Sequence, residues 1–304
     1  MVKIYETIIV GAGIAGCTAA IYAARKQMDY LLITEMFGGQ FYESGEVLNY
    51  PGIVNTTGAD FAKVMEEQLK FNKVKPVVGT VVKKIEKKGN NFLIKTNKKE
   101  YVTKTVILAT GSKPRQLGVP GEDKFQKLGV TYCAICDGPL FNGKDVVVIG
   151  GGDSALEAVD FLEKVAKKIY VLNIDDKFKA HEYLQARVKK AKNVKIINNA
   201  KTTKILGDKF VNALEYEQNG KVKKLKVQGV FVEIGRVSNT NFVKGLLDLD
   251  EHGHIVVDCQ TNSSVLGIFA VGDCSSVHEY QYVISAGTAC IALLKAAKYL
   301  AKKN

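Results

Sequence analysis

Short apolar runs alternate with longer mixed segments, and one such order occurs twice along the chain. Residues 7–10 form an apolar run that predicts a strand, residues 14–26 are rich in alanine and predict a helix, and residues 30–34 predict a second strand. The same order returns at residues 145–149, 154–164 and 169–172. Helix-length segments between buried strands favour a parallel sheet. The chain therefore contains an internal repeat of a strand–helix–strand unit.

The segments outside the repeat predict how its two copies are connected. Residues 112–118 read as a linker after a strand that ends near Gly111, and residues 251–254 predict a hairpin. A final helix over residues 285–302 is rich in alanine and leucine, like the first helix. We therefore expect an α/β fold with two Rossmann-like dinucleotide-binding domains, the second inserted into a discontinuous first. The expected boundaries are residues 1–114 with 243–304, and residues 118–240.

Both strand–helix junctions carry glycines in a fixed order. The first glycine motif is Gly11-Ala-Gly13-Ile-Ala15-Gly16, and the second is Gly150-Gly-Gly152-Asp153-Ser154-Ala155. In this pattern the first glycine makes the turn, the second lets the backbone approach a pyrophosphate, and the third allows close helix packing. The free N–H groups of the helix start then bind phosphate. Glu35 lies about 20 residues beyond Gly16, where an acid would bind ribose hydroxyls.

Composition narrows the function classes. Of 304 residues, 46% are hydrophobic and 24% are charged, which is ordinary for a globular protein. The apolar runs are of strand length, below the ~20 residues of a membrane span, and the N-terminus begins with a strand rather than a signal peptide. We therefore expect a cytoplasmic protein with no membrane partner.

The net charge of +12 comes mainly from lysine, because only four of the 43 basic residues are arginine. The lysines are scattered, mostly beside turns. This distribution is typical of a solvated surface, with steering of an acidic protein partner as the alternative. No basic run is interleaved with aromatic residues, so we expect no nucleic-acid partner.

One close pair of cysteines lies between the two glycine motifs, in the sequence Cys133-Ala-Ile-Cys136-Asp137-Gly138. A close pair in a cytosolic protein is more often catalytic than structural. One thiolate attacks a disulfide and a second cysteine resolves the mixed disulfide, while a neighbouring carboxylate moves the proton. A zinc site would need two more ligands, and the sequence has no second pair of this spacing, so no metal is expected.

In these residues the chain resembles the low-molecular-weight thioredoxin reductases, over nearly its whole length. The resemblance rests on the two glycine motifs, the cysteine motif, Gly38-Gly39-Gln40, Glu46-Val-Leu-Asn49-Tyr-Pro51-Gly52, Ala109-Thr110-Gly111 and Gly272-Asp273. The cysteine motif with its trailing Asp-Gly is the most specific of these. The resemblance implies an FAD domain, an inserted pyridine-nucleotide domain that carries the dithiol, and a homodimer.

The resemblance also assigns roles by position. It places Cys136 beside the flavin, Cys133 toward thioredoxin, and Asp137 as proton donor and acceptor. The residues that it places along FAD are Gly11, Gly13, Ala15, Gly16, Glu35, Gly39, Gln40, Asn49, Thr110, Gly111, Gly272 and Asp273, with Gln281 and Tyr282 standing where the family has an Arg-Gln contact to the flavin.

One stretch departs from the family pattern. Where the family carries His-Arg-Arg-x-x-x-Arg, whose arginines bind the 2′-phosphate of NADPH, this chain reads Asn173-Ile-Asp175-Asp-Lys-Phe-Lys179. Lysine lacks the bidentate fork of arginine, and an acid accepts hydrogen bonds from a free ribose 2′-hydroxyl. Asp175 and the intact second glycine motif (Gly150, Gly152, Asp153, Ser154 and Ala155) therefore favour NADH. A reduced deazaflavin or ferredoxin is the second alternative, and NADPH in a relaxed site is the third.

The sequence thus predicts an FAD-dependent thioredoxin-disulfide reductase that acts on thioredoxin or a glutaredoxin-like protein. One alternative is a subunit serving a peroxide-reducing partner; that group usually has an extra N-terminal dithiol domain, which we do not expect here. The other alternative is an FAD-binding redox sensor. The four histidines show no metal-ligand spacing. Cys17, Cys259, Cys274 and Cys290 are expected to be small buried residues, with Cys274 close to the flavin because it follows Asp273.

Overall fold

The computed structural model describes residues 3–43, 46–47, 49–278 and 280–302, with only the backbone of residues 42, 43, 46 and 136. The chain divides into two compact units. The first unit is Met1–Lys113 with Val237–Asn304, and the inserted unit is Pro114–Arg236. The expected fold class, an α/β protein with a second Rossmann-like unit inserted into a discontinuous first, is confirmed.

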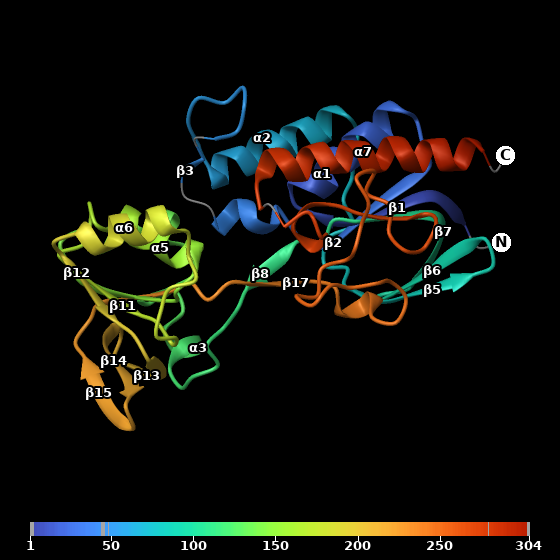
Figure 1. Cartoon of the computed structure of the whole chain (residues 1–304). Helices are drawn as coiled ribbons and strands as arrows, with labels where there is room; N and C mark the ends of the chain where they lie inside the picture. The colour runs from blue at the N-terminus through green and yellow to red at the C-terminus, as the bar shows by residue number, and fades with distance from the viewer. Residues whose placement is uncertain (1–2, 44–45, 48, 279, 303–304) are drawn as a thin grey trace. The chain divides into compact units, whose positions relative to one another are not determined.

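The first unit is built on a six-stranded sheet of order β2-β1-β7-β6-β5, with β18 also paired to β7. Strands β1 (Ile4–Ala12), β2 (Tyr30–Phe37), β7 (Glu100–Leu108) and β18 (Ile268–Ala270) run parallel. Strands β5 (Val82–Lys88) and β6 (Asn91–Thr96) form a hairpin, in which β6 pairs antiparallel with β7. Because β18 comes from the end of the sequence, the C-terminal segment completes a sheet begun by the N-terminus (Figure 1).

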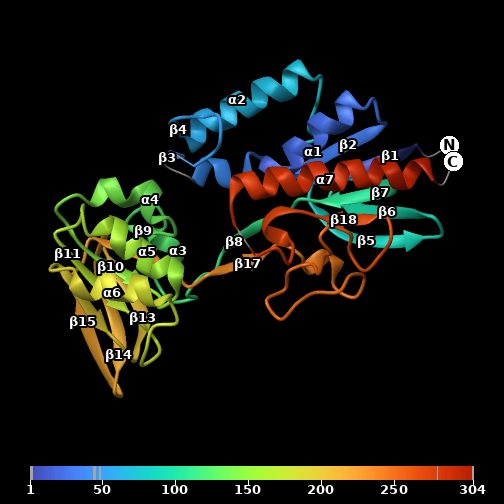
Figure 2. The same ribbon diagram turned by 45° about the horizontal axis from the view of Figure 1, so that its top comes forward.

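Two helices from opposite ends of the chain, α1 (Ile14–Arg25) and α7 (Tyr282–Ala301), lie side by side on one face of this sheet (Figures 1 and 2). Fully buried alanines such as Ala20, Ala289 and Ala292 allow this close packing. Helix α2 (Gly58–Phe71) adds Phe61 and Met65 to the same core. The shorter elements are η1 (Gly39–Glu43), β3 (Glu46–Val47), β4 (Thr56–Thr57), η3 (Asn241–Val243) and η4 (Gly272–Cys274).

Among the described residues, α7 is the one helix long and apolar enough to cross a membrane by length and composition. The sequence predicted this helix over residues 285–302 but not that it is apolar over such a length, because Gly287, Thr288 and Lys295 interrupt its large apolar side chains. Core helices of globular domains pass the same test. The inner face of α7 is fully buried in the core that it shares with α1, so α7 is a core helix of the first unit.

The inserted unit has a five-stranded parallel sheet of order β12-β11-β10-β16-β9. Val146 and Val148 of β10 face the helices, while Val147 faces an antiparallel three-stranded meander, so this strand is apolar on both sides. The strands of the sheet are β9 (Val130–Thr131), β10 (Asp145–Ile149), β11 (Lys168–Leu172), β12 (Val194–Ile197) and β16 (Gly229–Val232). The meander is β13 (Ala200–Gly207), β14 (Val211–Gln218) and β15 (Lys221–Leu225).

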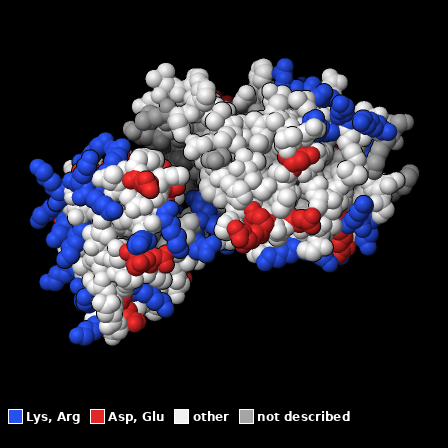
Figure 3. Space-filling view, viewed as in Figure 1, with Lys and Arg blue, Asp and Glu red and all other residues white. Residues whose placement is uncertain are grey.

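The helical elements of the inserted unit are α3 (Glu122–Phe125), α4 (Ala134–Asp137), η2 (Gly138–Phe141), α5 (Asp153–Leu162) and α6 (Glu182–Lys190). The two connections between the units, β8 (Ser112–Pro114) and β17 (Arg236–Ser238), pair with each other. On the face drawn in Figure 3, Lys and Arg side chains are spread over both units among Asp, Glu and uncharged residues rather than gathered in one patch.

Candidate functional site

A cavity of about 730 Å³ lies in the first unit at the carboxyl ends of β1, β2, β7 and β18. In open α/β sheets, ligands bind at this edge, and the volume suits a cofactor-sized molecule. All of its lining residues belong to the first unit. We call it the sheet-edge cavity.

The first glycine motif forms one wall of the sheet-edge cavity. Gly11 has φ +104°, and a Cβ there would lie 2.3 Å from the carbonyl oxygen of Ala109. A Cβ at Gly16 would lie 1.7 Å from the carbonyl oxygen of Gly11. At Gly13 a Cβ would meet no atom within 4 Å, and α1 starts there without a side-chain cap. The backbone N–H groups at the start of α1 therefore face open space, as phosphate binding requires.

The polar groups of the cavity converge on Asp273. Its carboxylate accepts hydrogen bonds from Gln40 Nε2 at 2.7 Å and from Ser112 Oγ at 3.3 Å. Tyr282 Oη donates to the backbone oxygen of Gln40 at 3.2 Å. Three segments far apart in the sequence are thereby tied together at one point, and an amide and a carboxylate become available to hydroxyl groups of a ligand.

Most of the residues that the sequence placed along the cofactor line this cavity. They are Gly11, Gly13, Ala15, Glu35, Gly39, Gln40, Thr110, Gly111, Gly272, Asp273, Gln281 and Tyr282. Gly16 and Asn49 do not line it: Gly16 packs against Gly11, and Asn49 Nδ2 donates to Gln281 Oε1 at 3.0 Å. Sequence reasoning did not assign the lining residues Ser112, Asn239 and Tyr280 to the cofactor.

The cysteine pair lies in the inserted unit at α4. Cys133 is half-buried and disulfide-bonded, while the side chain of Cys136 lies outside the described part of the chain. The Cys133 N–H donates to Thr131 Oγ1 at 3.2 Å. The same Thr131 hydroxyl donates a short hydrogen bond to Asp137. Thr131 thus connects the backbone of the first cysteine to the carboxylate that the sequence assigned to proton transfer.

Glu233 is a further acid near the cysteine pair. It directly follows β16, and its carboxyl group accepts a hydrogen bond from the backbone N–H of Ala134, next to Cys133. Burial raises the pKa of Glu233 to about 8, against the opposing effects of that N–H and of Arg236. Sequence reasoning missed Glu233 because it is distant from Cys133 along the chain and becomes its neighbour only through the pairing of β16 with β9.

The second glycine motif lies between β10 and α5. The carbonyl oxygen of Gly151 accepts hydrogen bonds from the N–H groups of Lys179 and Ala180, at 2.8 and 3.2 Å. Asp153 Oδ1 accepts the N–H of His181 at 2.7 Å. The segment after β11 is therefore held against the glycine turn. Gly150, Gly152, Ser154 and the fully buried Ala155 complete the turn and the start of α5.

Asp175 lies in this segment, after the carboxyl end of β11, the strand next to β10. An acid at this place in a Rossmann unit binds the ribose hydroxyls of the nucleotide. Here the Asp175 carboxylate pairs with Lys179 Nζ at 2.8 Å, and Asp175 raises the pKa of Lys179. The sequence predicted the position of Asp175 but not its ion pair with Lys179, which keeps the Lys179 ammonium group beside the Asp175 carboxylate.

Comparison with known proteins then decides the family. The sequence matches the family described as pyridine nucleotide-disulphide oxidoreductase over residues 5–291. The chain belongs to this family. Among solved structures, a thioredoxin reductase from Lactococcus lactis superposes on this oxidoreductase with a TM-score of 0.82 and 34% identity, covering 98% of this chain and 99% of that one. The predicted resemblance to the low-molecular-weight thioredoxin reductases is confirmed.

Two curated relatives carry other names. The oxidoreductase is 40% identical to an "NADH dehydrogenase" from Bacillus subtilis (strain 168), over 97% of this chain and 58% of the relative. It is 38% identical to a component of the alkyl hydroperoxide reductase from Xanthomonas campestris pv. phaseoli, over 99% of this chain and 58% of the relative. The chain thus spans less than two thirds of the length of these two relatives.

The family implies FAD with a pyridine nucleotide, and the sheet-edge cavity fits FAD. Its volume, the uncapped start of α1 behind Gly13, and the Gln40–Asp273 pair offer space, phosphate donors and hydroxyl partners, respectively. The cavity lies at the sheet edge that such ligands occupy. The oxidoreductase is accordingly a flavoprotein of the thioredoxin reductase type.

The cysteines outside the pair behave differently from one another. Cys17 is fully buried, and burial raises its pKa to about 12. Cys274 is also fully buried, with its thiol directed to the carbonyl oxygens of Leu108 and Val271, and it does not line the cavity. The expectation that Cys259 is buried was wrong. Asp258 accepts the N–H groups of Gln260 and Asn262, and this turn leaves Cys259 exposed.

Two glycine substitutions in the first glycine motif should have different effects. Gly13→Ala has room for its Cβ, so the protein should fold normally, while the new methyl group at the phosphate side lowers FAD affinity by at least about tenfold. Gly16→Ala forces its Cβ into the Gly11 backbone and should destabilise the first unit by about 3 kcal/mol or more. Flavin content and the urea midpoint, measured on both variants, separate the two effects. If Gly16→Ala unfolded at the same urea concentration as Gly13→Ala, the close approach of Gly16 to the Gly11 backbone would not contribute to stability.

Proposed function

We propose that this oxidoreductase passes electrons from NADH through FAD to the disulfide formed by Cys133 and Cys136, and from there to a small protein disulfide. Thioredoxin or a glutaredoxin-like protein is the proposed acceptor. The observation that carries the proposal is that the inserted unit holds the cysteine motif at α4, the second glycine motif between β10 and α5, and Asp175 after β11. The overall reaction oxidises one NADH, takes up one proton and converts one disulfide into two thiols.

FAD, when bound, supplies the two-electron step between nicotinamide and sulfur. The chain supplies the positioning. Gly13 and the uncapped start of α1 would hold the pyrophosphate, and Asp273 with Gln40 would hold the hydroxylated chain of the cofactor. The Cys133 thiolate attacks the partner disulfide and forms a mixed disulfide. The Cys136 thiolate then attacks Cys133, which re-forms the Cys133–Cys136 disulfide and releases the partner as a dithiol.

Protons are handled by acids beside the cysteine pair. Asp137, with the Thr131 hydroxyl on its carboxylate, receives a proton when a thiol becomes a thiolate and returns it to the leaving sulfur. Glu233 holds a proton at neutral pH because its pKa is raised to about 8, and it lies at the Ala134 N–H. It therefore adds a second proton reservoir beside the first cysteine.

NADH as donor is supported by Asp175 and by the name of the Bacillus subtilis relative. A second acceptor, the disulfide of a peroxide-reducing protein, is supported by the relatives named as components of alkyl hydroperoxide reductase.

A homodimer is supported by the exposed Val283, Ile291 and Leu294 on the outer face of α7, which a second copy would cover. Sedimentation equilibrium tests this assembly, since a molecule of one chain mass would contradict it.

The two acceptors are separated by a substrate comparison. With NADH in excess, the holoenzyme is given either oxidised thioredoxin or an oxidised peroxiredoxin with peroxide. We expect kcat/KM for thioredoxin to exceed that for the peroxiredoxin by at least about tenfold. The reverse order would favour the peroxide-reducing role. A burst of one disulfide per enzyme, without further turnover on either substrate, would favour a redox sensor.

A further inference from the structure

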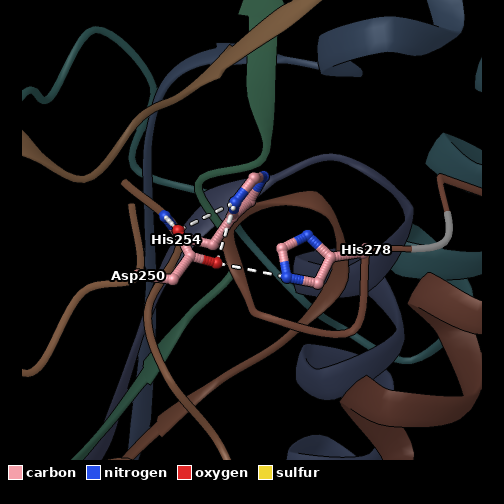
Figure 4. A group of neighbouring side chains, drawn as sticks. All are labelled: Asp250, His254 and His278. Atoms are coloured by element: carbon pink, nitrogen blue, oxygen red, sulfur yellow. Dashed lines mark hydrogen bonds and ion pairs between the residues drawn. The ribbon is translucent and has the colours of Figure 1, made fainter. Parts of the chain in front are cut away.

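Three side chains of the first unit converge outside the proposed electron path. Asp250, His254 and His278 each direct one ligand atom toward the others, and these atoms all lie within 4.8 Å of one another (Figure 4). We call them the histidine cluster. His254 lies close to Asp250 along the chain, but His278 comes from the segment between η4 and α7, so sequence spacing did not reveal the group.

Two imidazole nitrogens approach the same carboxylate oxygen. His254 Nδ1 and His278 Nε2 each lie 3.2 Å from Asp250 Oδ2, and His254 Nδ1 also lies within hydrogen-bond distance of Asp250 Oδ1, at 3.3 Å. Asp250 Oδ2 is buried, and despite the two short distances no hydrogen bond reaches it with acceptable geometry. A buried carboxylate oxygen without a hydrogen bond is costly unless a cation compensates it.

The separations match those of donor atoms around one small metal ion. Bonds of about 2.0–2.2 Å in a tetrahedral arrangement put neighbouring donor atoms about 3.3–3.5 Å apart. The two separations from Asp250 Oδ2, 3.2 Å each, are close to this value, and the ligand atoms of His254 and His278 lie within 4.8 Å of each other. Two nitrogens and one carboxylate oxygen also form a ligand set that zinc uses in open sites, whereas Ca²⁺ and Mg²⁺ prefer oxygen ligands only.

The surroundings orient each member of the cluster. His254 is buried, and its Nε2 is 2.8 Å from Tyr280 Oη, which leaves Nδ1 to face Asp250. Asp250 Oδ1 accepts the N–H groups of His252 and His254, both at 2.9 Å. Hydrogen bonds from neighbouring groups orient imidazole and carboxylate ligands in this way in protein metal sites.

We propose that Asp250, His254 and His278 bind one Zn²⁺ ion, or another borderline divalent transition metal, with the remaining position open to water. The site does not depend on the proposed electron path. It is linked to the sheet-edge cavity through Tyr280, which lines that cavity and whose hydroxyl lies 2.8 Å from His254 Nε2. An ion held by His254 would keep this imidazole against Tyr280 at the cavity wall and slow the release of FAD.

Calorimetric titration with Zn²⁺ tests the site. It uses the untagged holoenzyme with its cysteine pair oxidised, so that these thiols do not compete for the metal. We expect one ion per chain. His278→Ala should weaken binding by more than about 100-fold, because even outer-shell changes cost about 10- to 100-fold in affinity. His278 is exposed, and an unchanged flavin spectrum of the variant would confirm that it folds.

His252→Ala is the matched control. His252 is an exposed histidine of the same turn, its side chain is not a member of the cluster, and its loss should leave Zn²⁺ affinity unchanged. Asp250→Asn keeps the shape of the acid and should also abolish tight binding. FAD release, followed by flavin fluorescence after dilution with and without Zn²⁺, should slow in the parent and not in His278→Ala. The proposal is overturned if no ion binds, or if the parent and His278→Ala bind Zn²⁺ equally well.

Discussion

Cys133→Ser is expected to lower the rate of protein-disulfide reduction by at least about 1000-fold while leaving the protein yellow. Loss of a nucleophile in a unit of interacting catalytic groups typically removes several orders of magnitude of rate. FAD should remain bound, because every residue lining the sheet-edge cavity belongs to the first unit, whereas Cys133 belongs to the inserted unit. The measurement is steady-state thiol formation together with the flavin absorbance per chain.

Cys259→Ser is the control for this variant, because Cys259 is a free, exposed cysteine of the first unit. It should keep parental activity and parental flavin content. If Cys133→Ser retained thiol formation above about a hundredth of the parental rate, sulfur chemistry at α4 would not be the route to the acceptor. If it lost its flavin, the two units would be more interdependent than the lining of the cavity indicates.

Asp175→Ala is expected to shift the choice of nicotinamide donor. It removes the carboxylate that we assign to the ribose 2′-hydroxyl, and a hydrogen bond to a charged group contributes about 1.5–3 kcal/mol. We therefore expect kcat/KM for NADH to fall about 10- to 100-fold. The substitution also releases Lys179, now paired with Asp175 at 2.8 Å, for a 2′-phosphate, so kcat/KM for NADPH should rise.

Asp176→Ala controls for a general loss of negative charge, because Asp176 is the exposed neighbouring acid. This variant should change kcat/KM for NADH and kcat/KM for NADPH by no more than about twofold. The double variant Asp175→Ala, Lys179→Ala should lose the gain with NADPH if Lys179 provides it. Parental preference for NADPH over NADH would contradict the role assigned to Asp175.

The sequence predicted the parallel parts of both units because their strands are apolar on both faces and end in glycine turns. Val146, Val147 and Val148 are fully buried for that reason. It did not predict the three-stranded meander of β13, β14 and β15, because lysines in β13 and β15 and acids in β14 lie among the apolar residues and resemble a solvated loop. The strand β18 was also missed, because three residues give too short a pattern.

In the candidate sites, sequence motifs predicted the residues that belong to one short segment. They did not predict residues that reach the site only through contacts between distant segments. Gly13 and Asp273 were found from their motifs, and both line the cavity. Glu233 reaches Ala134 only because β16 pairs with β9, and His278 meets Asp250 only because the segment before α7 returns to the turn at residues 250–254. Such contacts depend on tertiary structure, and spacing along a single sequence carries no signal for them.

The most direct test of the proposed electron path is an anaerobic count of electrons from donor to sulfur. The holoenzyme is mixed with a limiting amount of NADH and an excess of oxidised thioredoxin, and NADH absorbance, flavin absorbance and free thiols are followed together. We predict two thiols formed for each NADH oxidised, over many turnovers, with the flavin returning to its oxidised spectrum when NADH is exhausted. Thiol formation that stops after one disulfide per chain, or a flavin that reduced ferredoxin bleaches and NADH does not, would contradict the account.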